Sequence, residues 1–262
     1  MLVYAFDVPA GQKGKPDIDQ AVAAVDRRLN PDGSWSKTAK VRRVSDAELE
    51  VRLRTDDPVA LAKIDRLVRV LGSLEFRILA NDHDNPGIVE RAKALGPQMN
   101  KLYSSNGRLE AWWVPVDPRA KKDFTSGVYR DIVQRTVKTN EGEQLLQALA
   151  LADRFNVTGS YLTYVAAGVD KRDRPEVLLG FNVVGAKKFA GLTSCNLPDE
   201  VTGFRRRVGI ILDARLFSAP TITGMIHDYA AISGDFTGNE VQQIIAVLNA
   251  GALPAPLKKV SP

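Results

Sequence analysis

Apolar and polar positions in the first eighty residues repeat with the periods of strands and helices. Short β-branched, aromatic or alternating runs predict strands at 3–8, 41–44, 49–53 and 74–78. Apolar residues at helical spacing predict one helix from Asp17 to Leu29 and a second from Asp57 to Leu71. The predicted order is β-α-β-β-α-β, the split βαβ or ferredoxin-like arrangement, with both helices on one face of the sheet.

Glycine and proline mark the ends of these elements. Pro9-Ala-Gly11 predicts a turn after the first strand, Asn30-Pro31-Asp32-Gly33 ends the first helix, and Gly72 ends the second. Residues 45 and 46 lie between the two middle strands, which predicts a hairpin with one solvent-facing side.

The last thirty residues predict a strand, a capped helix and a rigid exit. Thr237 and Glu240 have the spacing of a capping box. In this motif the Thr hydroxyl accepts from the Glu backbone N–H, and the Glu carboxylate accepts from the Thr backbone N–H. An apolar helical stripe follows, and Gly251 suits a left-handed helix stop. Pro254 and Pro256 then predict a stiff segment that leaves the domain.

Between these parts the pattern is less regular. Residues 109–115 predict a strand that carries Trp112 and Trp113, 118–124 a loop, and 127–137 and 141–155 helices. Two interpretations of the Trp pair stay open. Exposed aromatic side chains make good anchors for an unfolded peptide, whereas a Trp on a strand usually belongs to the core.

The pattern becomes clearer again after residue 157. Residues 174–181 predict a strand, 185–189 open a helix, and 208–213 with 216–222 predict a hairpin. Ala214 in that hairpin predicts a turn that avoids positive φ, since alanine disfavours this conformation.

Composition changes this picture little. Of the 262 residues, 44% are hydrophobic and 26% charged, as in a soluble globular protein, and the net charge of +5 is spread among interleaved signs. The densest basic run, Arg205 to Arg207, is too short for a nucleic-acid footprint. A single cysteine, Cys195, excludes an internal disulfide, and no apolar run approaches the roughly 18 residues of a membrane helix.

No catalytic constellation stands out. Asp82, His83 and Asp84 could supply metal ligands, but a polar hinge and helix cap is the favoured interpretation. His227 near Ser218 lacks a nucleophile-elbow motif, and no glycines have phosphate-loop spacing. We therefore predict no catalytic, cofactor-binding or metal-binding residue, and a protein that is not an enzyme. An RNA-recognition module, which stacks bases on strand aromatics, stays as the alternative function.

Several segments resemble the large extracytoplasmic domain of SecD, a subunit of the bacterial protein-export machinery. They are Gln20-Ala-Val22 with 26–33, Leu74-Glu-Phe-Arg77, 157–162, Gly185-Ala-Lys-Lys-Phe189, 208–222, 232–237 and Gly251-Ala-Leu-Pro-Ala-Pro-Leu257. The resemblance covers roughly residues 3–80 and 157–260. Residues 84–156 align with nothing in the family, which predicts a lineage-specific elaboration.

The resemblance implies an α+β domain with a ferredoxin-like base and an inserted α+β head. The base would comprise residues 1–80 and 230–262, and the head residues 81–229. Hinge candidates where the chain enters and leaves the head are Asn81, Asp82, Asp84, Asp228 and Ala231.

The resemblance also implies a location and partners. The domain would lie on the extracytoplasmic, periplasmic face of the inner membrane, between the first and second of six membrane helices that residues 1–262 do not include. Its partners would be a SecF-like subunit, the SecYEG channel and a translocating unfolded polypeptide. It would need no cofactor, and its head would move against its base during export assisted by the proton gradient.

Overall fold

The computed structural model describes residues 1–262 except 9–14, 31–38, 140–141, 234–235 and 262. The predicted turn at Pro9–Gly11, the helix break at Pro31–Gly33 and parts of the segments 141–155 and 232–237 fall outside the described residues. The chain forms two compact units. Unit 1 comprises residues 1–73 and 238–262, and unit 2 comprises residues 74–237.

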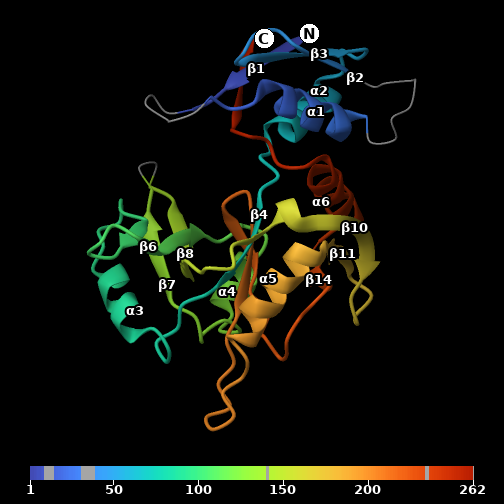
Figure 1. The fold of residues 1–262 in the computed structure, drawn as a ribbon. Helices are drawn as coiled ribbons and strands as arrows, with labels where there is room; N and C mark the ends of the chain where they lie inside the picture. The colour runs from blue at the N-terminus through green and yellow to red at the C-terminus, as the bar shows by residue number, and fades with distance from the viewer. Residues whose placement is uncertain (9–14, 31–38, 140–141, 234–235, 262) are drawn as a thin grey trace. The chain divides into compact units, whose positions relative to one another are not determined.

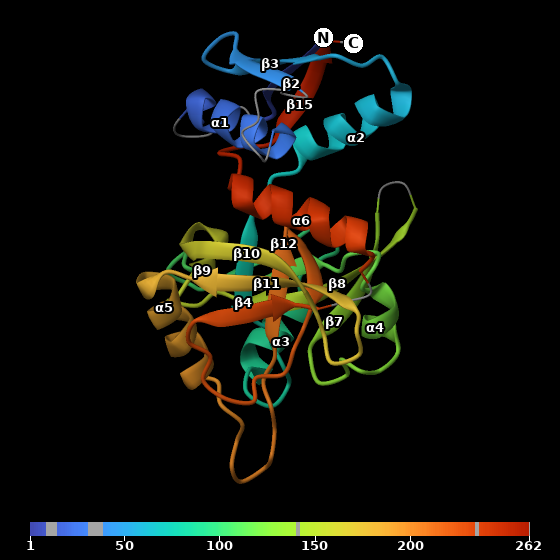
Figure 2. The same cartoon turned by 90° about the vertical axis from the view of Figure 1, so that its right-hand side faces the viewer.

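Unit 1 is an antiparallel sheet with helices on one of its faces (Figures 1 and 2). The strand order is β15-β1-β3-β2, and all three pairings are antiparallel. The elements of unit 1 are β1 (Leu2–Phe6), α1 (Ile18–Leu29), β2 (Ala39–Arg43), β3 (Glu48–Leu53), α2 (Pro58–Arg69), α6 (Gly238–Ala250) and β15 (Leu257–Ser261).

The start and stop signals of these helices act as predicted. The Asp17 carboxylate accepts from the backbone N–H groups of Asp19 and Gln20, and Asp57 caps α2 in the same way ahead of Pro58. Gly72 and Gly251 adopt φ of +73° and +84°, the left-handed conformation that follows a helix end. The capping box of Thr237 and Glu240 stays a prediction.

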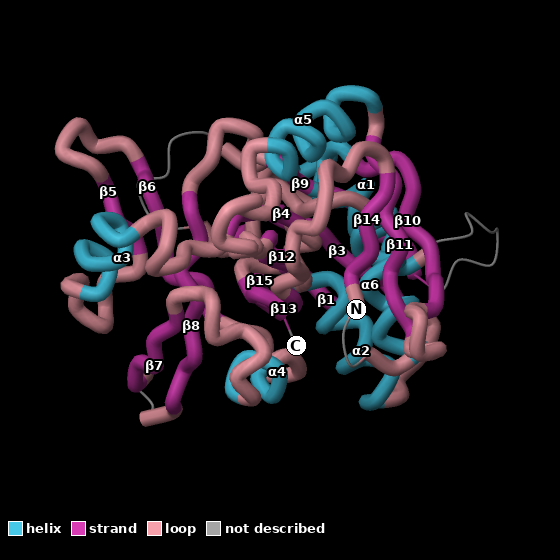
Figure 3. The backbone as a smooth tube through the Cα atoms, turned by 90° about the horizontal axis from the view of Figure 1, so that it is seen from below, coloured by secondary structure: helices cyan, strands magenta, loops and turns pink. Residues whose placement is uncertain are grey.

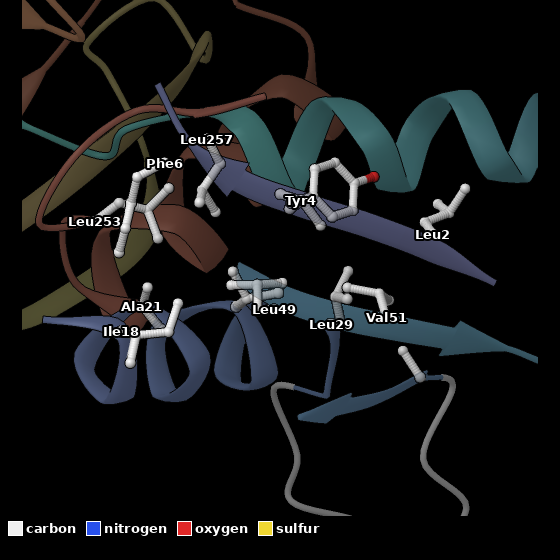
Figure 4. Packing of buried hydrophobic residues seen from close by; sticks show 14 of the residues in the cluster. Leu2, Tyr4, Phe6, Ile18, Ala21, Leu29, Leu49, Val51, Leu253 and Leu257 are labelled. Atoms are coloured by element: carbon white, nitrogen blue, oxygen red, sulfur yellow. The ribbon is translucent and has the colours of Figure 1, made fainter. Parts of the chain in front are cut away.

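The core of unit 1 lies between the sheet and its helices. Figure 4 shows side chains of β1, β3 and α1 gathered in one cluster, with Leu253 and Leu257 from the end of the chain in the same cluster. Tyr4 is fully buried there, and its hydroxyl donates to Asp65 (3.0 Å). The C-terminal segment is therefore part of this core.

Two predictions about this sheet are wrong. Residues 74–78 were expected to be its fourth strand, but they form β4 (Leu74–Ile78) in unit 2, paired with β12 (Val208–Leu212) and β9 (Val157–Thr158). The fourth strand of unit 1 is β15, which pairs with β1. The segment after Pro254 and Pro256 is thus a strand of the sheet, not a stiff exit from the domain.

The described residues of unit 2 form three sheets of antiparallel strand pairs, with the strand orders β10-β11-β14, β13-β12-β4-β9 and β5-β6-β8-β7. Figure 3 shows the four strands of the last sheet on one side of the view. The remaining elements are α3 (Pro86–Lys93), β5 (Lys101–Tyr103), β6 (Leu109–Pro115), α4 (Lys121–Thr125), β7 (Gln134–Lys138), β8 (Gln144–Leu151), η1 (Gly159–Tyr161), β10 (Leu162–Val169), β11 (Pro175–Phe181), α5 (Val183–Ser194), β13 (Arg215–Ser218) and β14 (Tyr229–Ile232).

The predicted strand at 109–115 is confirmed as β6, but the two helices predicted after it are wrong. Residues 134–138 and 144–151 are the hairpin strands β7 and β8. In β8, residues 148–150 are all buried, so both faces of the strand pack inside the protein. A strand buried on both sides has no alternation, and its run of Leu and Ala is also favourable in a helix.

The hairpin of β12 and β13 is confirmed, but the prediction for its turn is wrong. Asp213 and Ala214 adopt φ of 50° and 60°. Two consecutive residues with positive φ are typical of the tight turn whose twist matches that of a β-hairpin. The hairpin therefore imposes on Ala214 a conformation that alanine alone disfavours.

Candidate functional site

The sheet β10-β11-β14 in unit 2 has one buried and one exposed face. On the buried face, Val177 of β11 pairs with Ile232 of β14, and both are buried. Phe181 at the end of β11 packs against Phe76 and Phe189, with ring centroids 5.7 and 5.2 Å away. This aromatic cluster attaches the sheet to β4 and to α5.

The other face is apolar yet partly open to solvent. We call its apolar part the tyrosine face, and it consists of Tyr164, Ala166, Leu178, Gly180, Tyr229 and Ala231. Gly168 and Glu176, which accepts from Ser233, lie next to it on the same side of the sheet. Tyr164 lies opposite Gly180, and Gly180 lies opposite Tyr229, so the three residues form one row across the sheet. Half of Tyr164 and 72% of Tyr229 are exposed, which is unusual for two neighbouring aromatic residues.

Gly180 makes room for this row. A Cβ atom at Gly180 would lie 3.1 Å from Cβ of Tyr164 and 3.4 Å from the ring of Tyr229. A larger residue would thus push the two tyrosine side chains apart. The result is a flat apolar surface with phenol groups, which can bind apolar side chains and donate hydrogen bonds but offers no acid–base pair.

Sequence reasoning did not find the tyrosine face. Its two tyrosines lie 65 positions apart in the sequence and meet only through β11. The one local signal was Gly180 within an otherwise apolar strand, because a glycine inside a strand often marks close approach of neighbouring groups.

The two tryptophans have different surroundings. Trp113 is buried in unit 2, its indole N–H donates to the Ala92 carbonyl (3.3 Å), and Arg135 covers its ring. It is a core residue and does not present its ring to a ligand. Trp112 is half-buried, with the guanidinium of Arg77 5.5 Å from its ring centroid. A peptide contact at Trp112 stays a prediction.

The segment 81–85 is a polar turn inside unit 2. Asn81 is buried, and its side chain binds both the backbone N–H and the carboxylate of Asp84. Arg206 donates to both Asp84 oxygens (2.8 and 2.9 Å). Burial opposes ionisation of Asp84, but hydrogen bonds from Arg206, His83 and Asn81 outweigh it and hold the pKa of that carboxyl below its ordinary value.

This turn fixes a distant loop and is not arranged around a metal. The His83 ring stacks on Phe204 (4.7 Å between centroids), next to the Arg206–Asp84 pair. Asp82 lies 3.4 Å from Lys93. Asn85, not an aspartate, precedes α3 at the cap position. Within the described ranges, no group of three His, Cys, Asp or Glu side chains could hold a metal ion.

The other hinge candidates also lie in unit 2. The backbone carbonyl of Asp228 accepts from Phe181 N–H (3.0 Å), and Ala231 pairs with Leu178 within the sheet. The chain passes between the two units at 73–74 and 237–238, several positions from all five candidates. Nothing in these contacts tests the hinge role itself, which stays a prediction.

The remaining candidates for chemistry do not assemble. His227 is exposed, and no hydrogen bond joins it to Ser218 in the described part of the chain. In unit 1, Tyr4 and Phe6 are buried on the helix-covered face, so they cannot stack on bases. The structure gives no support to RNA recognition by this sheet.

Comparison with known proteins decides the family. Residues 133–255 match the family described as "SecDF, P1 head subdomain". The SecD protein of Elusimicrobium minutum is 30% identical over 200 residues, which is 75% of this chain and 36% of that protein. The SecD protein of Aquifex aeolicus is 34% identical over 187 residues, 70% of this chain and 33% of that protein. The chain belongs to the SecD/SecDF family.

A solved structure shares the fold of this SecD-family chain. It is described as "Structure and function of a membrane component SecDF that enhances protein export", with 24% identity and a TM-score of 0.63, and the match covers 100% of this chain and 98% of that one. The chain spans about a third of the length of the two SecD relatives. Among its described helices, none has the length and apolarity needed to cross a bilayer.

Proposed function

We propose that this chain is the P1 domain of a SecD-type export subunit, on the extracytoplasmic face of the inner membrane. Unit 2 acts as the head that engages an emerging polypeptide. The observation that carries the proposal is the match of residues 133–255 to the SecDF P1 head. The relatives named protein translocase subunit SecD support it, and a SecF-like subunit and the SecYEG channel are the proposed partners.

Unit 1 would be the base of this domain. Its strand order β15-β1-β3-β2 supports a ferredoxin-like arrangement in which β15 takes the place of the last strand. Unit 2 would then be an insertion between α2 and the elements α6 and β15. The insertion point supports a head that is joined to the base by two short connections.

The tyrosine face is the proposed polypeptide contact. An unfolded chain exposes apolar and aromatic side chains of varied sequence, and a flat aromatic surface can bind them without a fixed pocket. Tyr and Trp also dominate the binding energy of many protein contacts. Trp113 cannot serve because it is buried, so Tyr164 and Tyr229 join Trp112 as the proposed polypeptide contacts.

Photo-crosslinking during export tests this contact. In the full-length parent protein, a photoreactive residue in place of Tyr164 or Tyr229 is expected to crosslink to a polypeptide arrested in translocation. A probe at Val128, which is also exposed in unit 2, serves as the control and is expected to give little product. Crosslinks at no position of unit 2 would contradict the proposed function.

Motion of the head against the base is the second part of the proposal. We place the hinge at 73–74 and 237–238, where the chain changes unit. Two short connections permit rigid-body rotation with few backbone changes. Fluorophores at Val59→Cys in unit 1 and Val201→Cys in unit 2, with Cys195→Ser, are expected to report at least two distances by energy transfer.

A control pair within unit 2 separates rotation from local change. Labels at Val128→Cys and Val201→Cys are expected to keep one distance in the presence and absence of an unfolded polypeptide. A single unchanged distance for the Val59–Val201 pair under both conditions would mean that the units do not rotate.

A further inference from the structure

The sheet of unit 1 has a second face, directed away from α1 and α2. Strand register assigns its side chains: Val3 and Ala5 on β1, Glu48, Glu50 and Arg52 on β3, Lys40 and Arg42 on β2, and, on β15, Lys258, which lies 3.3 Å from Asp7. These residues alternate with Tyr4, Leu49 and Val51, which are buried against the helices. The face has only small aliphatic side chains at β1, and most of its charged residues lie on β2 and β3.

Two arginines contact one carboxylate on this face, and a lysine lies beside them. Arg42 donates to both oxygens of Glu50 (3.1 and 2.9 Å), and Arg52 donates to Glu50 as well. Glu50 is buried between them, whereas 59% of the Arg42 side chain and 55% of the Arg52 side chain are exposed. Lys40 is exposed and lies directly opposite Arg52. Glu50 thus offsets one of these three positive charges. Glu48 is a second carboxylate on this face, opposite Ala5 and four positions before Arg52 in β3.

Stability alone does not account for this cation cluster of Lys40, Arg42 and Arg52. Like charges directly opposite each other on neighbouring strands, as at Lys40 and Arg52, are destabilising. Lysine on an edge strand can prevent pairing with other chains, and β2 is an edge strand. Arg52, however, belongs to β3, which is paired on both sides. A surplus of positive charge on a solvent-facing sheet suits a negatively charged partner.

The cation cluster lies at a particular end of the sheet. Leu2 at the start of β1 pairs with Val51, and Arg52 is the next residue along β3. Ser261 at the end of β15 pairs with Val3. The start of β1, the end of β15 and the cation cluster therefore share one end of unit 1.

We propose that the cation cluster of Lys40, Arg42 and Arg52 binds the phosphate groups of anionic membrane lipids. The inference rests on the proposed function, which places this domain at the extracytoplasmic face of the inner membrane, next to a surface that contains anionic lipids. Lipid phosphates attract basic side chains near a membrane surface by roughly 1 kcal/mol each. The guanidinium groups of Arg42 and Arg52 can also hydrogen-bond to phosphate oxygens.

Vesicle flotation of the purified 262-residue chain tests the proposal. We expect binding to vesicles of phosphatidylcholine with phosphatidylglycerol, little binding to phosphatidylcholine alone, and a loss of binding as salt rises. The variant Lys40→Gln/Arg42→Gln is expected to lose about tenfold or more in partitioning, because each basic residue contributes roughly fivefold. The matched control Lys171→Gln/Arg172→Gln removes the same charge from an exposed turn of unit 2 and is expected to lose little.

A single substitution separates loss of lipid binding from misfolding of the variant. Lys40→Glu leaves the Arg42–Glu50–Arg52 contacts in place and is expected to reduce binding at least as much as Lys40→Gln, with an unchanged thermal transition. Equal losses in the two double variants would mean that binding follows net charge, and this result overturns the proposal. So does equal binding of the original chain to the two kinds of vesicle. Crosslinking at the tyrosine face would survive either result, so failure of this inference is distinguishable from failure of the proposed function.

Discussion

Replacing Arg28 with alanine is expected to destabilise unit 1 by about 3–5 kcal/mol, because several hydrogen bonds from one charged donor, each worth about 1.5–3 kcal/mol, are lost together. The side chain is 2% exposed. It donates to the carbonyls of Leu67 (3.2 Å) and Val70 at the end of α2, and to those of Leu71 (3.2 Å) and Gly251 (3.0 Å). It is thus a cation at the C-termini of two helices, where the helix dipoles favour positive charge.

The alanine variant removes a charged donor from these part-buried carbonyls, of which that of Leu71 keeps the bond from Leu253 N–H, and it opens a cavity. Calorimetry of the chain, with hydrogen exchange to assign each transition to a unit, measures the loss. Arg69→Ala is the matched control, because Arg69 lies in α2 but is exposed and its ion pair with Asp65 (3.4 Å) contributes less than about 1 kcal/mol. Similar losses in the two variants would show that Arg28 does not hold α2 and α6 together.

The predicted elements of unit 1 are accurate because local signals specify them. Asp17 and Asp57 cap their helices, Gly72 and Gly251 end theirs, and alternation identifies β3. Sheet membership was wrong for residues 74–78, since alternation identifies a strand but not its neighbour. The pairing of β1 with β15 joins the two ends of the chain, and no local pattern contains that information.

Unit 2 was less predictable for a physical reason. Strand β8 is buried on both faces, so its sequence lacks the alternation that separates strand from helix. The tyrosine face depends on the register of three strands, two of which are far apart in sequence. The tryptophans of β6 were ambiguous for another reason. The sequence of a strand with two adjacent tryptophans does not reveal that Trp113 is the one that is buried in the core.

Because of their order along the chain, the stability of unit 1 depends on the folding of unit 2 more than the stability of unit 2 depends on unit 1. Unit 2 is a continuous segment, residues 74–237, whereas unit 1 is assembled from the two flanking segments. When unit 2 is folded, it holds the two ends of the insertion at a fixed separation. When unit 2 is unfolded, it becomes a long flexible loop, and closing that loop costs the folding of unit 1 about 4–5 kcal/mol of conformational entropy. Unfolding of unit 1 imposes no such cost on unit 2.

Phe76→Ala makes use of this asymmetry and is expected to weaken both units. Phe76 is fully buried, with ring centroids 5.7 Å from Phe181 and 5.0 Å from Phe189, so it joins β4 to β11 and α5. Truncation of such a side chain costs about 3–5 kcal/mol. We expect calorimetry to show the transition of unit 2 at a lower temperature, and hydrogen exchange in α6 and β15 to rise with it.

Arg28→Ala provides the opposite control, because it weakens unit 1 and is expected to leave hydrogen exchange in β4 and β11 unchanged. Protection of β15 that persists after unit 2 has unfolded in the Phe76→Ala variant would contradict the dependence of unit 1 on unit 2. In the proposed function, that dependence means that a head which unfolds also releases α6 and β15, the elements that complete the base. A stable head is then a condition for an intact base, and the Phe76 cluster stabilises both.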